Sequence, residues 1–337
     1  MIIANDDKRL QWNGAVSLER ADGWVRPWRL PHEALDLYAP GDSPLREKAE
    51  CPAGIRLCLR TDADTLRLAV APMPAAGNTD LYADGELVET LEFAAGQESL
   101  SFDGLPAGEK DLELWLSQTV PFGLGHIEVP DGSLVAQSRD ARPRWVTYGS
   151  SITHCGAAAS PSFTWPAVVA RKMGFNLTSM GYGGQCHADP MLARLIRDTP
   201  ADFVSLKLGI NIYGNGSLNP RSFRPAVIGS IATVRDGHPH IPLVVCSPIW
   251  SPPREAEKNA VGFTLAQMRL EVEAAVEAFK AHGDGAIHYV DGLRLFDESL
   301  AEHLPDDLHP SAQGYQLMGE NFARVVFEEI GVEVRAL

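Results

Sequence analysis

The stretch Trp145-Val146-Thr147-Tyr148-Gly149-Ser150-Ser151-Ile152 predicts a buried strand that breaks into a turn and exposes a serine. Tryptophan, valine and tyrosine favour a β-strand, and a glycine followed by two small serines permits a tight exit from it. A serine hydroxyl at such a turn acts as a nucleophile only if a base and donors for an anion converge on it. The rest of the chain must therefore supply those partners.

Strand-like and helical segments alternate from this point to the end of the chain. Apolar side chains repeat every three to four positions over 265–279 and 315–326, which predicts two helices that end before Gly283 and Gly331. Alternation of this kind predicts a parallel sheet with helices on both faces, a three-layer α/β/α fold. The strand-like runs are 145–148, 175–180, 203–208, 243–246 and 287–290.

The N-terminal part of the chain has a different pattern, in which short apolar alternations are interrupted by turn residues. Asp84-Gly85 is a hairpin turn sequence, and the whole pattern predicts an antiparallel β-sandwich or jelly roll. The polar stretch 131–143 lacks periodicity and is predicted to be a linker, so we expect domains at 1–140 and 141–337. The short strands are expected at 55–59, 66–70, 80–82, 100–102, 112–116 and 126–129.

The amino-acid composition limits the kinds of molecule that this protein is expected to bind. The chain has 337 residues, 45% of them hydrophobic, and a formal net charge of −15. That charge argues against a nucleic acid or an anionic membrane as the main partner and favours a small-molecule or carbohydrate substrate. Residues 1–30 lack the features of a signal peptide, and no later run resembles a membrane span, so a cytoplasmic protein is expected.

Five cysteines are scattered along the chain without a CxxC pair. Their number and spacing predict reduced thiols rather than a disulfide framework or a zinc ribbon. The sequence contains no strong metal motif, and we expect neither a metal nor a cofactor.

The segments that follow the first four predicted parallel strands are rich in glycine and small polar residues. Because sites of such sheets lie outside the carboxyl ends of the strands, we expect these segments to line one cleft. They are 149–154, 181–187, 209–214 and 247–253.

A later loop, Pro305-Asp306-Asp307-Leu308-His309-Pro310, offers an acid and a base together. The carboxylate of Asp306 can fold back in a turn and accept from His309 Nδ1, which leaves Nε2 for a serine. Asp307 is the alternative acid. Pro310 biases the backbone of His309 towards an extended conformation and is expected to start the next helix.

Donors for an anion are available in the second and third segments. Gly183 and Gly184 can present a backbone N–H with no Cβ in the way, and Asn211 can present a side-chain amide.

Four blocks of sequence resemble the SGNH (GDSL-type) hydrolase family in order and spacing: Gly149–Thr153, Gly181–Gln185, Gly209–Asn211 and Asp306–Pro310. The resemblance covers about residues 144–330. It implies a flavodoxin-like catalytic domain in which Ser151 is the nucleophile and Asp306 and His309 complete a triad. It also implies an oxyanion hole made by Gly184, Asn211 and the Ser151 N–H.

The N-terminal half, with Asn78-Thr79-Asp80-Leu81-Tyr82, looks like the carbohydrate-binding-module-like sandwich fused ahead of the hydrolase in one subgroup. The catalytic half departs from the family pattern at two positions. Ser150 stands where an aspartate usually precedes the nucleophile, which leaves two adjacent serines as candidates, and Ile212 replaces an aspartate after Asn211.

Three further side chains are candidate substrate-binding residues because they lie next to these blocks: Trp250, His154 and His187. Pocket lining and core packing are equal alternatives for Trp250. For Trp12, Trp24, Trp28 and Trp115 we favour a place in the sandwich core over a carbohydrate-binding face.

The function expected from the sequence is a serine esterase that forms an acyl-enzyme on Ser151 and hydrolyses an acetyl or other short acyl ester of a small or carbohydrate-like molecule. One alternative is an acyltransferase that uses the same triad to acylate an alcohol. The alternative from another class is a catalytically inactive binding protein, which the missing aspartate at position 150 suggests.

Overall fold

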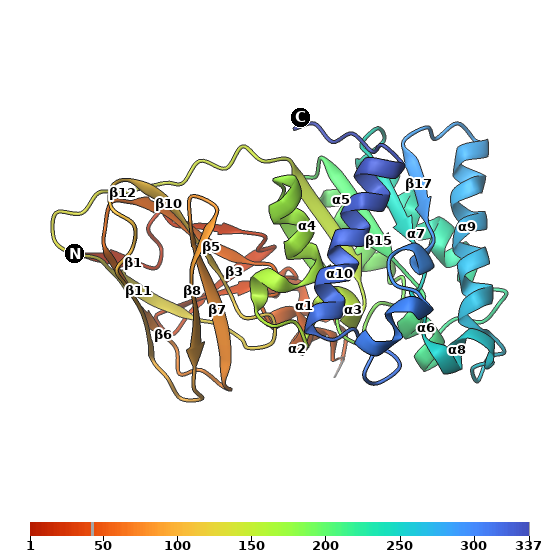
Figure 1. The fold of residues 1–337 in the computed structure, drawn as a ribbon, viewed down its shortest axis with the longest axis horizontal. Coiled ribbons are helices and arrows are strands. Elements are labelled where there is room, and N and C mark those ends of the chain that lie inside the picture. Colours follow the sequence, from red (N-terminus) through yellow and green to blue (C-terminus); the bar gives the residue numbers. More distant parts are fainter. Residues whose placement is uncertain (42–43, 337) are drawn as a thin grey trace. The chain divides into compact units, whose positions relative to one another are not determined.

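A computed structural model describes residues 1–41 and 44–336 (Figure 1). The chain forms two compact units. One comprises Met1–Ala141 together with Ser160–Ser162, and the other comprises Arg142–Ala159 together with Phe163–Leu337. None of the described helices is both long and apolar enough to cross a membrane.

The first unit contains two antiparallel sheets, which confirms the predicted sandwich. One sheet has the order β3-β4-β11-β6-β9 with β1 paired to β11, and the other has the order β12-β5-β10-β7-β8 with β2 paired to β5. The strands are β1 (Ile2–Ala4), β2 (Gln11–Asn13), β3 (Ser17–Ala21), β4 (Trp24–Trp28), β5 (Arg56–Thr61), β6 (Thr65–Val70), β7 (Gly77–Ala83), β8 (Glu86–Phe93), β9 (Ser99–Asp103), β10 (Lys110–Trp115), β11 (Leu124–Glu128) and β12 (Val135–Ala136). A 3₁₀ turn (His32–Ala34) and two short helices, α1 (Leu35–Tyr38) and α2 (Leu45–Glu50), lie between β4 and β5.

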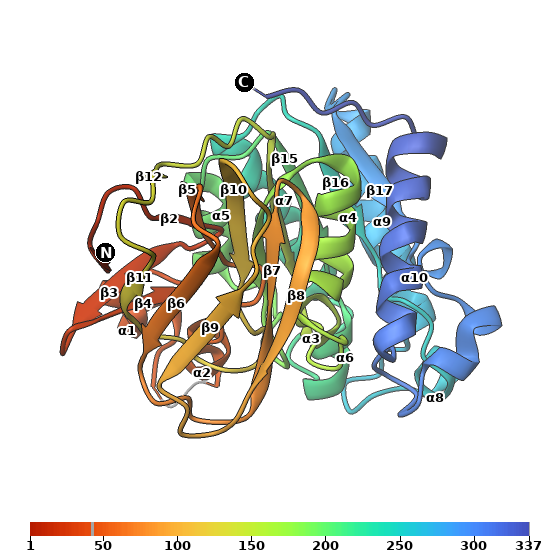
Figure 2. The same cartoon turned by 60° about the vertical axis from the view of Figure 1, so that its left-hand side comes forward.

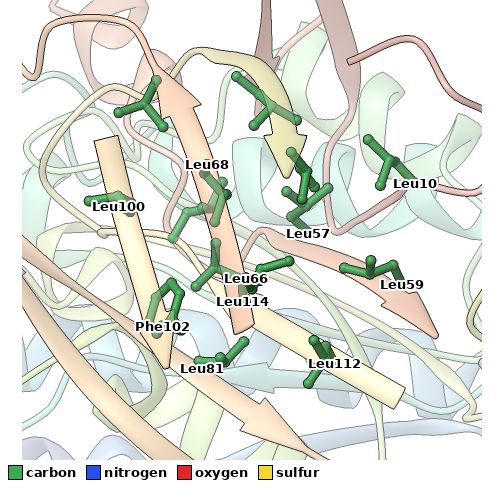
Figure 3. Close-up of a cluster of buried hydrophobic side chains, with 14 of the residues drawn as sticks. Leu10, Leu57, Leu59, Leu66, Leu68, Leu81, Leu100, Phe102, Leu112 and Leu114 are labelled. Atoms are coloured by element: carbon green, nitrogen blue, oxygen red, sulfur yellow. The ribbon is translucent and has the colours of Figure 1, made fainter. Parts of the chain in front are cut away.

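Leucine side chains fill the core between these sheets (Figure 3). Buried and more exposed residues alternate along strands such as β6 and β10, because successive side chains of a strand point to opposite faces. Residues of both sheets contribute to one cluster, which includes Leu57, Leu59, Leu66, Leu68, Leu81, Leu100, Phe102, Leu112 and Leu114.

Two local predictions in this unit have different outcomes. The Asp84-Gly85 hairpin is confirmed: both residues have positive φ, 49° and 86°, as a two-residue turn with matching twist requires. The predicted linker at 131–143 is partly wrong, because it contains β12. Strand β12 pairs with β5, and Thr61 Oγ1 donates to the Leu134 carbonyl at 2.7 Å. A strand of two residues is too short to produce a hydrophobic period, so the sequence pattern could not indicate it.

A buried carboxylate explains why Ser160–Ser162 belong to the first unit. Asp80 Oδ2 accepts from Ser160 Oγ at 2.6 Å and from the Ser162 N–H at 2.8 Å. Its other oxygen accepts from Thr90 Oγ1 at 2.6 Å. Asp80 has no exposed surface, and these donors provide the hydrogen bonds that a buried carboxylate needs.

The second unit is a five-stranded parallel sheet with the order β14-β13-β15-β16-β17. Helices α4 and α10 pack together on one face, and α5, α7 and α9 pack on the other (Figure 2). This is the predicted flavodoxin-like α/β/α arrangement. The strands are β13 (Arg144–Gly149), β14 (Asn176–Gly181), β15 (Phe203–Lys207), β16 (Leu243–Cys246) and β17 (Ile287–Val290).

All five predicted strands are present within about one residue at each end. The helix predicted after Pro310 begins two residues later, because Ser311 is its N-cap and accepts from the Gly314 N–H. The helices are α3 (Ser151–His154), α4 (Trp165–Met173), α5 (Pro190–Asp198), α6 (Ile210–Asn215), α7 (Phe223–Gly237), α8 (Pro252–Ala256), α9 (Leu265–Ala281) and α10 (Ala312–Ala323), which continues into a π-helical turn (Arg324–Glu329).

Trp145 at the start of β13 is the centre of an aromatic cluster. Its ring lies 5.7 Å from those of Phe203 and Phe322 and 5.9 Å from that of Trp165, measured between centroids. These contacts join β13 to β15, α4 and α10. They fix the strand that leads to Ser151.

We predict that Leu112→Ala destabilises the first unit by about 2–5 kcal/mol, because Leu112 is fully buried and the substitution leaves a cavity. Leu87→Ala is the matched control, since Leu87 is 42% exposed, and it should change the free energy of unfolding by less than about 0.5 kcal/mol. Urea unfolding followed by circular dichroism measures both, and equal effects of the two variants would contradict the core assignment.

Candidate active site

Two glycines allow helix α3 to pack against the ends of β13 and β14. Gly149 and Gly181 are neighbours in register. A Cβ on Gly181 would lie 2.5 Å from the His154 nitrogen, and a Cβ on Gly149 would overlap the Thr153 side chain. Only glycine at both positions lets the helix that begins with Ser151 come this close to the sheet.

Ser150 is the N-cap of α3. Its hydroxyl accepts from the Ile152 N–H at 3.2 Å, and the residue is buried, with 1% of its surface exposed. Capping is a role that serine and aspartate share. Ser150 therefore supplies a local structural function that an aspartate at this position could supply, and its hydroxyl points into the helix turn.

Ser151, His309 and Asp306 form a chain of hydrogen bonds. Ser151 Oγ lies 2.9 Å from His309 Nε2, and His309 Nδ1 lies 2.7 Å from Asp306 Oδ2. With the Nδ1 proton donated to the carboxylate, Nε2 is free to accept from the serine hydroxyl. This arrangement activates a serine for attack on a carbonyl carbon.

The turn around Asp306 holds its carboxylate ionised. Burial acts to raise the pKa of Asp306, but the backbone N–H and the ring of His309 and the Leu308 N–H all donate to the carboxylate and lower the pKa below its ordinary value. Asp306, rather than Asp307, is thus the acid in contact with the imidazole.

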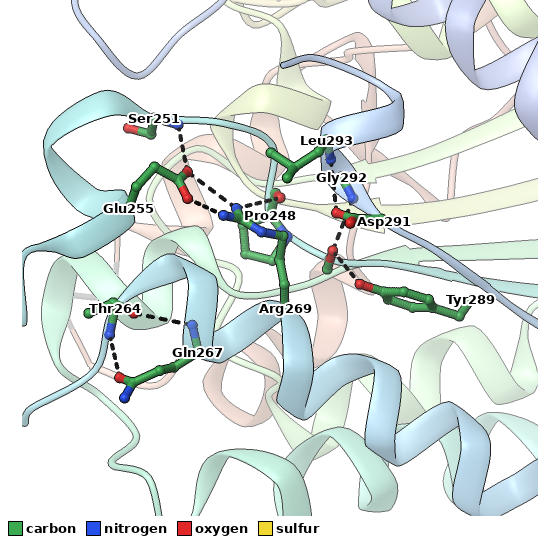
Figure 4. Close-up of polar contacts among 11 residues, drawn as sticks. Pro248, Ser251, Glu255, Thr264, Gln267, Arg269, Tyr289, Asp291, Gly292 and Leu293 are labelled. Atoms are coloured by element: carbon green, nitrogen blue, oxygen red, sulfur yellow. Dashed lines mark hydrogen bonds and ion pairs between the residues drawn. The ribbon is translucent and has the colours of Figure 1, made fainter. Parts of the chain in front are cut away.

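The loop after β16 supports this turn through the backbone of Asp307. Asp307 has a positive φ of 59°, and its carbonyl accepts from Ser251 Oγ at 2.5 Å and from Arg254 at 3.0 Å. The Ser251 N–H donates to Glu255 at 3.1 Å, and Glu255 is paired with the buried Arg269 of α9 (Figure 4). Helix α9 therefore stabilises the position of Asp307, which lies between Asp306 and His309 in the sequence.

Three donors beside the serine have no acceptor within the described parts of the chain: the N–H of Ser151, the N–H of Gly184 and the Nδ2 of Asn211. The Ser151 N–H is the first of α3 and faces no preceding turn. Asn211 Oδ1 accepts from the Cys186 N–H at 3.0 Å. The Nδ2 group of the same amide therefore points away from the Cys186 N–H. Such a set can stabilise an oxyanion.

The two candidate histidines contact the glycine loop. His154 is buried, and its Nδ1 accepts from the Gly183 N–H at 3.3 Å. His187 lies 2.8 Å from Ser217 Oγ and 3.1 Å from the Gly184 carbonyl. Both therefore contact the loop that presents Gly184, and the substrate contact expected of each stays a prediction.

Backbone strain is concentrated in the loops of this site. Cys155, Ala188 and Asp307 have φ near +60°, and they follow the serine helix, the glycine loop and the acid, respectively. Non-glycine residues in this conformation persist only where the surrounding structure holds them, which is common at functional sites.

A cavity of about 370 Å³ opens beside Ser151. Besides Ser151 it is lined by Gly156, Ala157, Pro305, Asp306, His309, Pro310 and Tyr315. Trp250 is half-buried and is not among these residues, so a pocket-lining role for it remains a prediction.

Lys207, the last residue of β15, is a charged side chain that the sequence analysis missed. It is 4% exposed, and its Cβ lies 3.5 Å from the position that a Cβ on Gly149 would take. Burial lowers the pKa of Lys207 to about 8, and the nearby thiols of Cys246, Cys186 and Cys155 partly oppose this shift. The sequence signal that could have indicated this buried lysine is a charged residue near the end of the mainly apolar run 203–208.

All five cysteines are free and buried, as expected from their spacing. Burial raises the pKa of the Cys186 and Cys246 thiols to about 12, so they remain protonated at neutral pH. Among the residues that the structure describes, no group of three or more His, Cys, Asp or Glu side chains could hold a metal ion.

Comparisons with known proteins identify both units. A model of the GDSL-like lipase/acylhydrolase family matches residues 147–317, and a model of the SsfX3 N-terminal domain matches residues 10–125. The solved structure of the salicylyl-acyltransferase SsfX3 from a tetracycline biosynthetic pathway is 34% identical, with a TM-score of 0.90 and 99% of each chain covered.

Two more distant structures share the fold over nearly the whole chain. A protein from Bacteroides ovatus described as a GDSL-like lipase is 17% identical, with a TM-score of 0.78 and coverage of 100% and 99% of the two chains. A family two carbohydrate esterase from Clostridium thermocellum is 15% identical, with a TM-score of 0.70 and coverage of 96% and 100%. No curated protein sequence matches this chain.

We predict that Ser150→Ala lowers the free energy of unfolding by about 1 kcal/mol, because the Ile152 N–H loses its acceptor. Ser150→Asp should keep most of the stability, since aspartate caps as well as serine does. Thermal unfolding of the three proteins measures the difference. Equal losses in both variants would show that the cap is not what position 150 contributes.

Lys207→Met should alter how stability depends on pH. The pKa of Lys207 is lower in the folded chain than its ordinary value of 10.5, so the unfolded chain binds more protons between about pH 8 and pH 10.5. Wild-type stability should therefore rise over this interval relative to Lys207→Met, by up to roughly 3 kcal/mol at 1.36 kcal/mol per pH unit. Urea unfolding at pH 7.5 and pH 10 tests this, and parallel curves would contradict it.

Proposed function

Because this chain belongs to the GDSL-like lipase/acylhydrolase family, we propose that it is a serine esterase that cleaves a short acyl ester of a small or carbohydrate-like molecule through an acyl-enzyme on Ser151. The observation that carries this proposal is the chain of hydrogen bonds from Ser151 Oγ through His309 to Asp306, at 2.9 Å and 2.7 Å. An ester-hydrolysing or acyl-transferring enzyme is the class that these features support together.

The reaction has two halves. His309 Nε2 takes the proton of Ser151 as Oγ attacks the acyl carbon, and the carbonyl oxygen becomes an oxyanion bound by the N–H groups of Ser151 and Gly184 and by Asn211 Nδ2. The oxyanion collapses, the bond to the alcohol oxygen breaks, and His309 gives its proton to that oxygen. Water, deprotonated by His309, then attacks the acyl carbon. The bond between that carbon and Ser151 Oγ breaks, His309 returns the proton to Oγ, and the acid leaves.

Asp306 supports both halves without exchanging a proton. Its carboxylate accepts from His309 Nδ1, keeps the tautomer that leaves Nε2 free, and stabilises the imidazolium that forms when His309 takes the serine proton. Asp306, whose pKa lies below its ordinary value, is an ionised carboxylate at neutral pH.

The second candidate function is acyl transfer to an alcohol, in which the acceptor hydroxyl replaces water in the second half. The specific observation that favours it is the likeness to a salicylyl-acyltransferase over 99% of both chains. The inactive-binding alternative was motivated by the missing aspartate at position 150. The missing aspartate no longer argues for an inactive protein, because Ser150 caps helix α3 at that position.

We predict that Ser151→Ala abolishes hydrolysis of p-nitrophenyl acetate, whereas Ser150→Ala keeps measurable activity because its hydroxyl is the helix cap and not the group bound to His309. Initial rates of the purified proteins test this. Activity that survives in Ser151→Ala but disappears in Ser150→Ala would move the nucleophile by one residue, and equal rates in all three proteins would refute the proposal.

Asn211→Ala should lower kcat by about 10²–10³, because one oxyanion donor is lost, and should leave KM within a few-fold. The matched control is Asn215→Ala, whose side-chain amide donates to the Asn211 carbonyl and lies outside the proposed hole. A change confined to KM in Asn211→Ala would contradict its role as an oxyanion donor.

Product analysis separates hydrolysis from transfer. With p-nitrophenyl acetate and added alcohols, an esterase releases mainly acetate, whereas an acyltransferase forms the new acetyl ester at low acceptor concentration. Transfer that outcompetes hydrolysis there would replace the esterase proposal by the acyltransferase.

A further inference from the structure

The cavity beside Ser151 lies on the histidine side of the serine. Its walls include Ser151, His309 and Asp306, but the described residues around it do not include Gly184 or Asn211. Two of the three donors, the Gly184 N–H and Asn211 Nδ2, therefore lie outside the described walls of this cavity. A substrate bound to the donors and to the cavity must place its carbonyl oxygen at the donors and another group in the cavity.

The proposed chemistry decides which group that is. In the tetrahedral intermediate the acyl carbon carries the Ser151 oxygen, the oxyanion, the alcohol oxygen and the acyl substituent. The alcohol oxygen must lie within hydrogen-bonding reach of His309 Nε2, because His309 protonates it as it leaves. The carbon skeleton attached to that oxygen then extends along the imidazole, where Pro305, Pro310 and Tyr315 line the cavity.

The walls of this part are chiefly apolar. Pro305, Pro310 and Ala157 offer no side-chain hydrogen-bonding group, and the polar atoms of His309 and Asp306 are already paired with each other and with Ser151. These walls offer a sugar hydroxyl few protein partners, whereas they offer an apolar skeleton apolar surface to cover. Tyr315, which is 1% exposed, adds one phenol, and burial raises its pKa so that it stays neutral.

We propose that this cavity binds the alcohol part of the ester and that it selects an alcohol with an apolar skeleton, such as a benzylic or alicyclic one, over a sugar. The inference rests on the proposed function, because it uses His309 as the proton donor to the leaving alcohol. In acyl transfer the same cavity holds the acceptor alcohol, since the second half of the reaction retraces the first. Gly156 and Ala157 set its size, because larger side chains there would enter the space beside Ser151.

Two isomeric esters test the assignment with the same atoms. Benzyl acetate carries the ring on the alcohol side, and methyl phenylacetate carries it on the acyl side. The wild-type enzyme should show a kcat/KM for benzyl acetate at least about tenfold above that for methyl phenylacetate and for 6-O-acetylglucose. A preference for methyl phenylacetate would assign the cavity to the acyl group, and a preference for the sugar ester would overturn its apolar selectivity.

Ala157→Leu connects the preference to the cavity. It should lower kcat/KM for benzyl acetate about tenfold, mainly through a higher KM, because the larger side chain occupies part of the cavity. Ala232→Leu, at an exposed position of α7, is the matched control and should leave this kcat/KM unchanged. Unchanged kinetics of Ala157→Leu on benzyl acetate would show that this cavity does not hold the alcohol.

Alcohol binding by the wild-type enzyme provides a measurement that does not depend on any variant. Added benzyl alcohol should intercept the acetyl-enzyme and inhibit competitively, whereas glucose at the same concentration should do neither. Equal effects of both compounds would overturn the proposal. If no ester is turned over and Ser151→Ala equals wild type, the failure lies in the proposed function and not in the assignment of the cavity.

Discussion

The hydrogen bond between Ser151 Oγ and His309 Nε2 joins residues that are 158 positions apart. Its length of 2.9 Å depends on two turns, each placed at the end of a regular element. Ser151 starts a one-turn helix that glycines 149 and 181 allow to approach the sheet. His309 belongs to a turn that Asp306 closes from inside, while Ser251 and Arg254 hold the carbonyl of Asp307 from outside.

The parallel sheet makes this meeting possible. The ends of β13, β14 and β15 lie side by side, so the loops that follow them reach one place. Asn211 and Gly184 arrive from two of those loops, and the Cys186 N–H sets the orientation of the Asn211 amide. Three residues in these loops, Cys155, Ala188 and Asp307, have a left-handed backbone conformation. This conformation is strained for residues other than glycine, and the neighbouring contacts must maintain it.

Sequence reasoning located the parts of the chain with strong periodicity. The five parallel strands, the two long helices and the Asp84-Gly85 hairpin produce repeating patterns of apolar and turn residues, so they could be predicted. The strands before residue 30 are three to five residues long, too short for a clear pattern, and β12 has only two residues. Residue types at the ends of the predicted strands, together with the resemblance to the SGNH family, led to the candidates Ser151, His309, Asp306, Gly184 and Asn211.

The residues that sequence reasoning missed act through contacts between distant segments. Ser251 and Arg254 matter because of the Asp307 carbonyl, and no property of positions 251 and 254 alone indicates that partner. Adjacency to Ser151 was the basis for expecting His154 to contact substrate, and it could not show that His154 is buried and accepts from the Gly183 N–H. The presence of serine at position 150 is explained by its role as the N-cap of helix α3, which only the structure shows.

The most direct test of the central claim is covalent labelling with a fluorophosphonate, which reacts only with a serine that is already activated. Peptide mapping by mass spectrometry should place a single adduct on Ser151 in the wild-type protein, and His309→Ala should lose it while remaining folded. Labelling of Ser150, or labelling of Ser151 that is as fast in His309→Ala as in wild type, would contradict the account.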